Sequence, residues 1–376
     1  MKTTADAVII GAGIMGCAIA HALAERGLTD VVVLERDQIG RGATADAAGG
    51  VRQQFSTATN IRLATESVRV WETFPERFGR DIGLRQQGYL FLLSNPGEEA
   101  VFRANLALQQ SLGVPARWVT PEEIAELDPH VVLDDIYGGT YCPEDGWCDT
   151  YGATIGFAQA ARTLGVEIVE ETFVTGIRVE ADQVTGVETA DGVVSAPLVI
   201  ISAGPQTRGV GEMAGVELPV DPYRRMSFIT EPLPALPQSL PMTIDFASGL
   251  YFHPESHGFL FGMANREEPS SFNKTNDAWF DTTKFSQPAA FTFGTCGSNT
   301  LRGPGQKTLN ASVQSAAMGV AAFVGGQLVS RGPQGEVQHY WMAAIVGVVA
   351  TLGSLWLAGR LTLHGAGAPP SGAAKN

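Results

Sequence analysis

The spacing of apolar residues changes twice near the start of the chain. Val8, Ile9 and Ile10 form an uninterrupted apolar run, which is typical of a short parallel strand buried on both faces. A turn of small residues and a helical stretch follow, and Val31 to Leu34 form a second apolar run. The pattern predicts a strand, a turn, a helix and a second strand.

The turn contains three glycines with the spacing G-x-G-x-x-G, namely Gly11, Gly13 and Gly16. In such a unit the first glycine permits the tight turn, the second lets the backbone approach a pyrophosphate, and the third lets the helix pack closely on the strand. A glycine turn can also serve chain geometry alone. Here the strand, the helix and an acid at the right distance accompany it, so we interpret the unit as a dinucleotide site. The acid, Glu35, can accept hydrogen bonds from a ribose diol, which favours FAD or NAD over NADP. Arg36, directly after it, is a further candidate cofactor residue.

A second loop, Ile39 to Gln54, is rich in small residues and would let the backbone run along an extended cofactor. Its candidate cofactor contacts are Gly42, Thr44, Gly49 and Gly50. The Thr44 hydroxyl would lie within reach of a phosphate.

With this loop the chain resembles the FAD-dependent oxidoreductases of the D-amino-acid oxidase superfamily, particularly the sarcosine oxidase beta-subunit-like and dimethylglycine dehydrogenase-like branch. The resemblance implies FAD as cofactor. It also implies that Val174 meets the adenine through its backbone and that Ala203 and Gly204 return the chain to the cofactor. It covers only residues from about 5 to 280, through the segments GATADAAGGVRQQFS, RQQGYLFLLSN, DGWCDTYGATIGFAQAARTLGVEI, ISAGP, PYRRMSFITEP and TIDFASGLYFHPE.

Further along, helical and strand patterns alternate. Helical periodicity at 57–79 and 97–113 is separated by an apolar strand at 88–93. Thr120 begins a capping box with proline at the first helical position, which predicts a short helix. Asp149 is placed to cap a further helix, after which several short strands follow.

The resemblance implies an α/β fold in which two domains are interleaved along the chain. One is a Rossmann-like FAD-binding domain and the other an incomplete α+β substrate domain, with a C-terminal apolar helical segment after them. The FAD-binding domain would comprise residues 1–55 and 146–210, and the substrate domain residues 56–145 and 211–280.

Two residues are candidates for catalysis. The resemblance suggests that Arg52 lies near the flavin ring, where its guanidinium could hold a substrate carboxylate and place the adjacent C–H over flavin N5. A salt bridge that fixes the loop is an equally open alternative. Tyr251 matches a region that lines the substrate face in sarcosine-type oxidases, where a phenol can orient an amine or carboxylate. Packing within a strand is the alternative, which we favour slightly.

Other polar residues nearby are expected to have structural roles. His253 and His257 flank a predicted turn, where paired histidines are more often solvated than catalytic. Of Arg224 and Arg225, strand alternation places at most one on the substrate side. No general base stands out, and the family scarcely requires one because the flavin supplies the difficult chemistry.

Composition narrows the function classes. The formal net charge of -14 argues against a nucleic-acid partner, whose phosphates require a basic face. The four cysteines show neither a CxxC pair nor zinc spacing, so we expect reduced thiols and no metal. The N-terminus has no signal-peptide pattern, and the flavin domain is therefore expected in the cytoplasm.

The C-terminal part has a different character. Residues 281–310 are expected to form an irregular linker, residues 311–360 one or two apolar helices, and residues 361–376 a disordered tail. The stronger helix candidate, Tyr340 to Gly359, has 20 uncharged residues with aromatic and basic edges, which suits a transmembrane span and would anchor the flavin domain to a membrane. A buried core helix is the alternative.

Two explanations for this ending remain open: a natural fusion to a membrane anchor, or a chimera with unrelated sequence. We favour the chimera, because a fusion should preserve the catalytic domain intact. With its C-terminal catalytic portion missing, the chain could retain FAD through the ADP half and yet lose turnover.

The function expected from the sequence is FAD-dependent oxidation of a secondary or tertiary amine, or of an amino acid, by hydride transfer to flavin N5. Electrons would pass to oxygen or to an electron-acceptor protein. One alternative is a non-catalytic flavoprotein that acts as a membrane-associated assembly or scaffold factor. A second is an NAD-dependent dehydrogenase.

Overall fold

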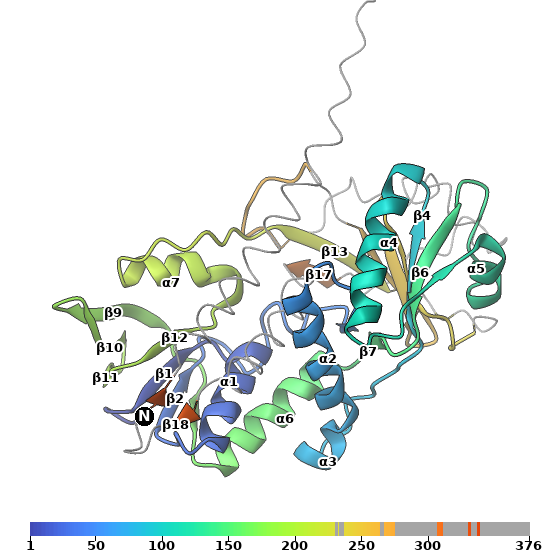
Figure 1. The fold of residues 1–376 in the computed structure, drawn as a ribbon. Coiled ribbons are helices and arrows are strands. Elements are labelled where there is room, and N and C mark those ends of the chain that lie inside the picture. Colours follow the sequence, from blue (N-terminus) through green and yellow to red (C-terminus); the bar gives the residue numbers. More distant parts are fainter. Residues whose placement is uncertain are drawn as a thin grey trace, which may run out of the picture.

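The computed structural model describes residues 1–229, 232, 237–263 and 267–274, together with the backbone of three short strands at 307–310, 330–331 and 337–338. Within these residues the chain forms two lobes, each built on its own sheet (Figure 1). The apolar stretch at 340–359 and the tail at 361–376 lie outside the described residues.

The first lobe contains a four-stranded parallel sheet in the order β12-β1-β2-β8. Every residue of β1 (Ala7–Ile10) and β2 (Val31–Leu34) is buried, as the uninterrupted apolar runs predict. Helix α1 (Ile14–Glu25) connects these two strands. The chain returns to the sheet much later, with β8 (Glu167–Val169) and β12 (Val199–Ile201).

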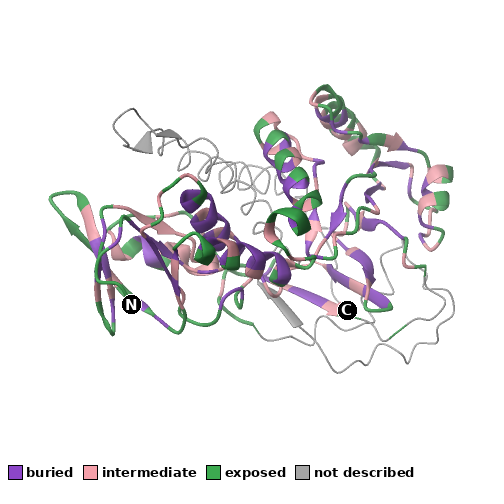
Figure 2. Ribbon diagram, turned by 90° about the horizontal axis from the view of Figure 1, so that it is seen from below, coloured by how far each residue is buried: buried purple, intermediate pink, exposed green. Residues whose placement is uncertain are grey.

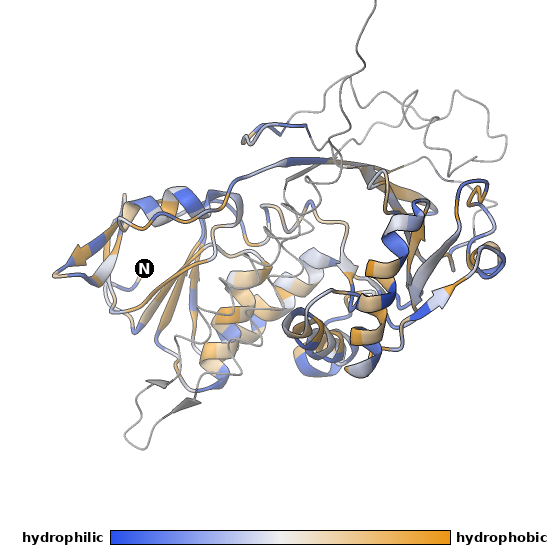
Figure 3. Cartoon of the chain, turned by 45° about the horizontal axis from the view of Figure 1, so that its top comes forward, coloured by the Kyte–Doolittle hydropathy of each residue, from blue (hydrophilic) through white to orange (hydrophobic). Residues whose placement is uncertain are grey.

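Both faces of this sheet are covered. Ile9 and Val33 pack with α1 and with α6 (Thr150–Thr163) on one face. On the other face, a three-stranded antiparallel sheet and α7 (Thr207–Met213) complete the core. Apolar residues accordingly concentrate on the strands of the parallel sheet and on the helix beside them (Figure 3). The strands of the small sheet are β9 (Val174–Glu180), β10 (Gln183–Thr189) and β11 (Gly192–Ser195).

The second lobe contains an eight-stranded sheet in the order β17-β13-β16-β15-β14-β4-β6-β5, with buried residues along its central strands (Figure 2). Strands β4 and β14 are parallel, and the other neighbouring pairs are antiparallel. The strands are β4 (Tyr89–Leu93), β5 (Arg117–Val119), β6 (Gly138–Cys142), β13 (Arg224–Ile229), β14 (Met242–Asp245), β15 (Tyr251–Glu255), β16 (Gly258–Met263) and β17 (Lys307–Asn310).

Alternation along these strands sorts the side chains between two faces. Leu90, Leu92 and Phe252 contribute to a core that includes Ile124 of helix α5. Tyr89 and Phe91 point to the opposite face, together with other apolar residues of the sheet and with Trp147. Helices α4 (Pro96–Ser111) and α5 (Pro121–Leu127) belong to this half. Helix α2 (Ala58–Glu72) packs both on α4 and on the core of the first lobe, and α3 (Phe74–Phe78) packs in that first core beside α6.

A short two-stranded ladder links the lobes. Strand β3 (Gly50–Val51), at the end of the second small-residue loop, pairs antiparallel with β7 (Gly146–Trp147). A Cβ added at Gly50 would lie 2.1 Å from the Tyr89 hydroxyl oxygen, so this loop is packed directly against the second sheet. The face of that sheet carrying Tyr89 therefore lies toward the loop.

Several local expectations can be compared with the structure. The capping box at Thr120 is confirmed, with Thr120 and Glu123 bonded reciprocally. The expected side-chain cap by Asp149 is wrong, because Asp149 precedes α6 without a capping hydrogen bond. Strand β17 lies within 281–310, where an irregular linker was expected, and pairs with β13. Among the described residues, no helix is long and apolar enough to span a membrane.

Candidate functional site

The glycine turn after β1 is fixed by steric contacts that only glycine permits. Gly11 has φ +104°, and a Cβ there would lie 2.5 Å from the carbonyl oxygen of Ser202. At Gly16, a Cβ would lie 1.8 Å from the carbonyl oxygen of Gly11. The first and third glycines therefore let the turn and the helix approach neighbouring backbone.

The N-terminus of α1 has neither a side-chain cap nor an acidic residue that would compete with a bound anion. Gly13 precedes the helix in extended conformation, without a side chain to cap it, and the first turn contains no acidic residue. The Ile14 N–H donates to the Thr44 hydroxyl at 3.2 Å, which brings the second loop to the helix terminus. Free N–H groups and the positive end of the helix dipole attract phosphate at such a position.

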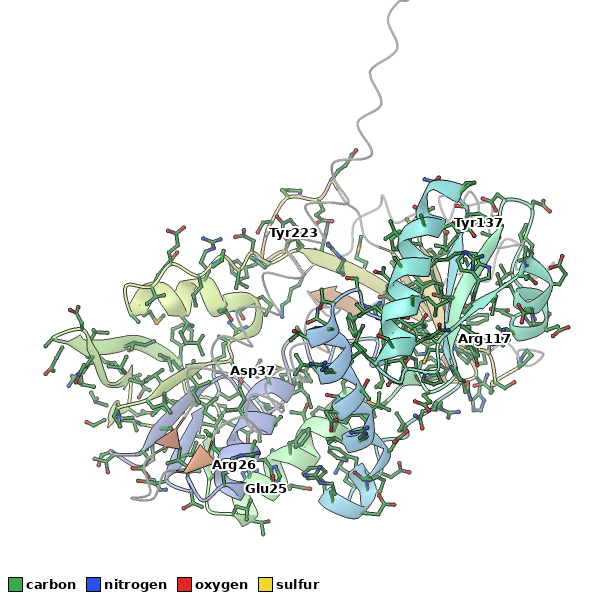
Figure 4. All side chains as sticks on the ribbon, viewed as in Figure 1. Glu25, Arg26, Asp37, Arg117, Tyr137 and Tyr223 are labelled. Carbon is green, nitrogen blue, oxygen red and sulfur yellow. The ribbon has the colours of Figure 1, made fainter. Side chains whose placement is uncertain are left out.

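Glu35 is held beside this turn. One carboxylate oxygen accepts a hydrogen bond from the Ala12 N–H at 2.7 Å, and the other accepts from the Asp37 N–H at 2.9 Å. These two hydrogen bonds place the carboxylate of Glu35 next to the glycine turn, whereas the side chain of Arg36 is exposed. Figure 4 shows Asp37 on the first lobe, far from Arg117 and Tyr137 on the second.

The other candidate cofactor residues converge on the same edge of the parallel sheet. Ser202 directly follows β12 and its N–H donates to the Ile10 carbonyl at 2.8 Å; Ala203 and Gly204 come next. Gly204 has φ +54° with nothing within 4 Å of a Cβ added there, and Gly42 is equally open. Val174 is buried against the strands of the same sheet.

Two further glycines position the second loop. Gly49 has φ +73°, and a Cβ there would lie 2.2 Å from the Cys148 carbonyl oxygen. Gly50 is similarly crowded by Tyr89. These contacts hold the loop in place, and the open helix terminus at Gly13 and the carboxylate of Glu35 fit the pyrophosphate and the ribose of a dinucleotide cofactor.

Arg52 extends from the end of this loop toward the second sheet. Its guanidinium carbon lies 4.6 Å from the ring centroid of Phe55, 5.5 Å from that of Phe91 and 6.0 Å from that of Tyr89. These distances fit cation–π contacts. In the described part of the chain, Arg52 forms no salt bridge and its buried Nε has no hydrogen-bond partner.

Tyr251 lies on the sheet face that Arg52 approaches. It pairs with Ile244 on β14, and Ile244 pairs with Phe91 on β4, so the three side chains share one face. Burial raises the pKa of Tyr251, nearby Tyr89 raises it further, and Arg225 opposes the shift. The phenol therefore stays protonated at neutral pH and can donate a hydrogen bond.

The two adjacent arginines of β13 separate as strand alternation predicts. Arg225 lies on the face of Tyr251, and burial lowers its pKa against the opposing effects of Glu268 and Tyr251. Arg224 points to the other face and forms a buried salt bridge with Glu268 at 2.5 Å. Only Arg225 is therefore available on the side of the candidate site.

His253 differs from the expectation of a solvated loop histidine, which is wrong for this residue. It lies within β15, is 1% exposed, and its ring centroid is 4.6 Å from that of Trp147. Burial lowers its pKa, so the imidazole is neutral at pH 7. His257 lies in the following turn with φ +67°.

Asp145 is a residue that the sequence interpretation missed. Its carboxylate is fully buried and accepts hydrogen bonds from the Gln53 N–H at 2.9 Å and the Gln54 side-chain amide at 3.3 Å. Burial raises the pKa of Asp145 to about 6, although these bonds oppose the shift. The acid in the PEDGW turn, directly before an apolar pair, was the available signal.

The thiols and possible metal ligands add no competing chemistry in the residues that the structure describes. Cys17, Cys142 and Cys148 are free, and burial raises the pKa of each thiol. No cluster of three metal-ligating side chains occurs in these residues.

Comparisons with known proteins show which family and which proteins the chain is similar to. A sequence model of the family described as FAD dependent oxidoreductase matches residues 6–322, and so continues beyond residue 280, the limit expected from the motifs. The chain is 32% identical over 271 residues to the mitochondrial dimethylglycine dehydrogenase of Rattus norvegicus, covering 71% of this chain and 32% of that protein. It is also 32% identical over 268 residues to the mitochondrial sarcosine dehydrogenase of Homo sapiens, covering 70% of this chain and 29% of that protein.

The chain thus spans about a third of the length of these two dehydrogenases. Among solved structures, it is similar to L-proline dehydrogenase from P. horikoshii, with a TM-score of 0.69 and 32% identity over 74% of this chain and 75% of that one.

Proposed function

Because this chain belongs to the family of FAD-dependent oxidoreductases, we propose that it binds FAD and oxidises a secondary or tertiary amine, or an amino acid, that carries a carboxylate. The FAD, when bound, accepts the hydride at N5. The relatives whose names specify dimethylglycine, sarcosine and proline support this substrate class. Oxygen or an acceptor protein would take up the electrons.

On the cofactor side, the proposal rests on main-chain geometry. The helix terminus after Gly13 would hold the pyrophosphate through N–H groups, and Thr44 would lie beside it. Glu35 would accept hydrogen bonds from the adenosine ribose. The acid favours a ribose without a 2′-phosphate, consistent with FAD.

On the substrate side, Arg52 is the observation that carries the proposal. A guanidinium bordered by three aromatic rings, and with no carboxylate within salt-bridge distance among the described residues, is suited to pair with an incoming carboxylate. Tyr251 would donate its phenolic proton to the same ligand from the facing sheet. Together they would orient the amine and its C–H bond, and orientation is a large part of catalysis when the cofactor supplies the chemistry.

The experiment that tests this function is anaerobic mixing of the purified flavoprotein with sarcosine, dimethylglycine or L-proline. Bleaching of the flavin absorbance is expected with at least one of them. Arg52→Gln should lower kcat/KM for that substrate about 100-fold, since a bidentate charged contact is lost. Arg41→Gln is the matched control, because Arg41 is an exposed arginine of the same loop that bonds only to Gln38 among the described residues. An Arg52→Gln protein with unchanged kinetics would contradict the proposed substrate site.

Two further parts of the proposal stay predictions. One is membrane contact through 340–359, which lies outside the described residues, and the other is a cytoplasmic location of the flavin-binding part. The match of the family to residue 322 and the pairing of β17 with β13 support a second lobe that continues past residue 280.

A further inference from the structure

We propose that Asp145 is a positioning residue for Arg52: its buried carboxylate fixes the backbone that presents the Arg52 guanidinium to a substrate carboxylate. The inference rests on the proposed function, since it assigns Asp145 a part in the same substrate site.

The Asp145 carboxylate is hydrogen-bonded to the two residues directly after Arg52. One oxygen accepts from the Gln53 N–H at 2.9 Å and from the Gln53 side-chain amide at 3.4 Å. The other accepts from the Gln54 side-chain amide at 3.3 Å. Gln53 and Gln54 are both buried, so these bonds form away from water, where a lost partner is expensive. The main chain cannot turn at Gln53 without breaking them.

The same residue also connects the loop to the rings around Arg52. The Gly88 N–H donates to the Asp145 carbonyl at 2.8 Å, directly before β4. The Gln54 amide that bonds to Asp145 also donates to the Tyr89 carbonyl at 3.0 Å. Asp145 therefore sets the separation between the loop carrying Arg52 and the strand carrying Tyr89 and Phe91.

The carboxylate acts through these hydrogen bonds more than through its charge. Burial is the largest influence on the pKa of Asp145 and raises it, while the Gln53 and Gln54 bonds lower it more strongly than Arg52 does. Without this carboxylate, the buried amide donors of Gln53 and Gln54 would lose an acceptor.

The test uses the FAD-loaded full chain and two probes of similar shape, benzoate and the uncharged benzamide, with binding followed through the flavin spectrum. Asp145→Asn should weaken benzoate binding about 10-fold, because the new amide group meets the Gln54 amide donor. Benzamide binding should change less than about twofold, since the neutral probe does not depend on the charge of Arg52. The Arg52→Gln, Asp145→Asn double variant should bind benzoate no more weakly than Arg52→Gln alone, because both act through one contact.

Asp128→Asn is the matched control. Asp128 is also fully buried, and it accepts hydrogen bonds from the His130 N–H at 3.1 Å and the Thr243 hydroxyl at 3.2 Å. Thr243 faces the side of the sheet opposite Tyr89, since it neighbours Met242 on β14. This substitution should leave benzoate binding unchanged.

The unsubstituted protein provides a second readout. As the pH falls through about 6, the Asp145 carboxylate takes up a proton. One of its oxygens then carries an O–H that faces the N–H donors of Gln53 and Gln54. Benzoate affinity should fall over this range in the unsubstituted protein and stay level in Asp145→Asn. Burial raises the pKa of Tyr89, Tyr141 and Cys142, so these neighbours stay neutral. Within the part of the chain that the structure describes, the charged or titratable groups that face Asp145 or the glutamines bonded to it are Arg52, Tyr89, Tyr141, Cys142 and Glu144.

The outcomes separate the inference from the function on which it depends. Unchanged or tighter benzoate binding by Asp145→Asn, with Arg52→Gln weakened, overturns the positioning role and leaves the proposed substrate site standing. Arg52→Gln that binds benzoate as tightly as the unsubstituted protein removes the substrate site, and the role of Asp145 with it. If Asp145→Asn does not retain FAD, the pH titration of the unsubstituted protein decides, and a level profile overturns the inference.

Discussion

The cofactor side of the candidate site is formed by one short segment of the chain, whereas the substrate side is formed by several segments that are far apart in the sequence. The glycine turn, the helix terminus and Glu35 all lie between Gly11 and Glu35, and their geometry depends on backbone. The surroundings of Arg52 come from four segments far apart in the chain, and their geometry depends on side chains. The first region therefore tolerates no added Cβ at its close contacts, whereas the second can be altered in small steps.

The largest expected effect is on the cofactor side, with Gly13→Phe. A Cβ at Gly13 already lies 3.1 Å from the Thr44 hydroxyl, and a ring would occupy the space of the pyrophosphate. FAD affinity should fall at least about 100-fold, because the N–H contacts at the helix terminus are blocked. Flavin absorbance per protein measures this.

Gly209→Phe serves as the control for Gly13→Phe, since nothing lies within 4 Å of a Cβ at Gly209 in α7. It should retain normal flavin content. A yellow, flavin-saturated Gly13→Phe protein would rule out the pyrophosphate site.

An intermediate effect on stability is expected from Asp145. The pKa of this carboxyl is about 6 in the folded protein against an ordinary value of 3.8. The folded state therefore holds the proton between these pH values while the unfolded state releases it, and stability falls as pH rises through this window. A pKa difference of about two corresponds to about 3 kcal/mol.

The free energy of unfolding of Asp145→Asn, relative to the unsubstituted protein, should accordingly increase by about 3 kcal/mol between pH 4 and pH 7. Denaturant unfolding at several pH values measures this difference. Ionisable groups that both proteins share contribute equally to both and cancel. A difference that does not change with pH would mean that Asp145 has an ordinary pKa.

The smallest expected effect is from Glu35→Gln. The amide oxygen can still accept from the Ala12 N–H, so the turn is retained, but the charged acceptor for a ribose diol is lost. We expect FAD affinity to fall about 10-fold, in keeping with the greater strength of charge-assisted hydrogen bonds. Isothermal titration of the apoprotein with FAD tests this, and an unchanged Kd would place the ribose elsewhere.

The same contrast explains what the sequence could predict. The elements around Gly11 and Glu35 are local, so residue spacing was sufficient to indicate them. The capping box at Thr120 is likewise local and is confirmed. The failed cap at Asp149 shows the limit, because the helix begins where the pattern predicts while the carboxylate makes no capping hydrogen bond.

The substrate side was less predictable, because its members meet only through sheet register. The pairing of β14 with β4 and β15 puts Tyr251 on the face of Phe91, and no local pattern contains that information. His253 was expected in solvent since a turn follows it, but its strand runs beneath Trp147. Asp145 was missed because an acid in a turn is usually exposed, whereas here β7 follows it and pairs with β3, and Gln53 and Gln54 bond to its carboxylate.

The position of β1 between β2 and β12 has a consequence for synthesis on the ribosome. Its partner β2 is synthesised soon after it, but β12 begins only at Val199. One edge of an entirely apolar strand therefore stays without its hydrogen-bonding partner until most of the described residues have been synthesised. Contacts between segments so far apart form slowly, and an unpaired apolar strand invites association with other chains in the meantime. The newly made N-terminal region therefore needs shielding, by a chaperone or by its own helix, until the later strand arrives.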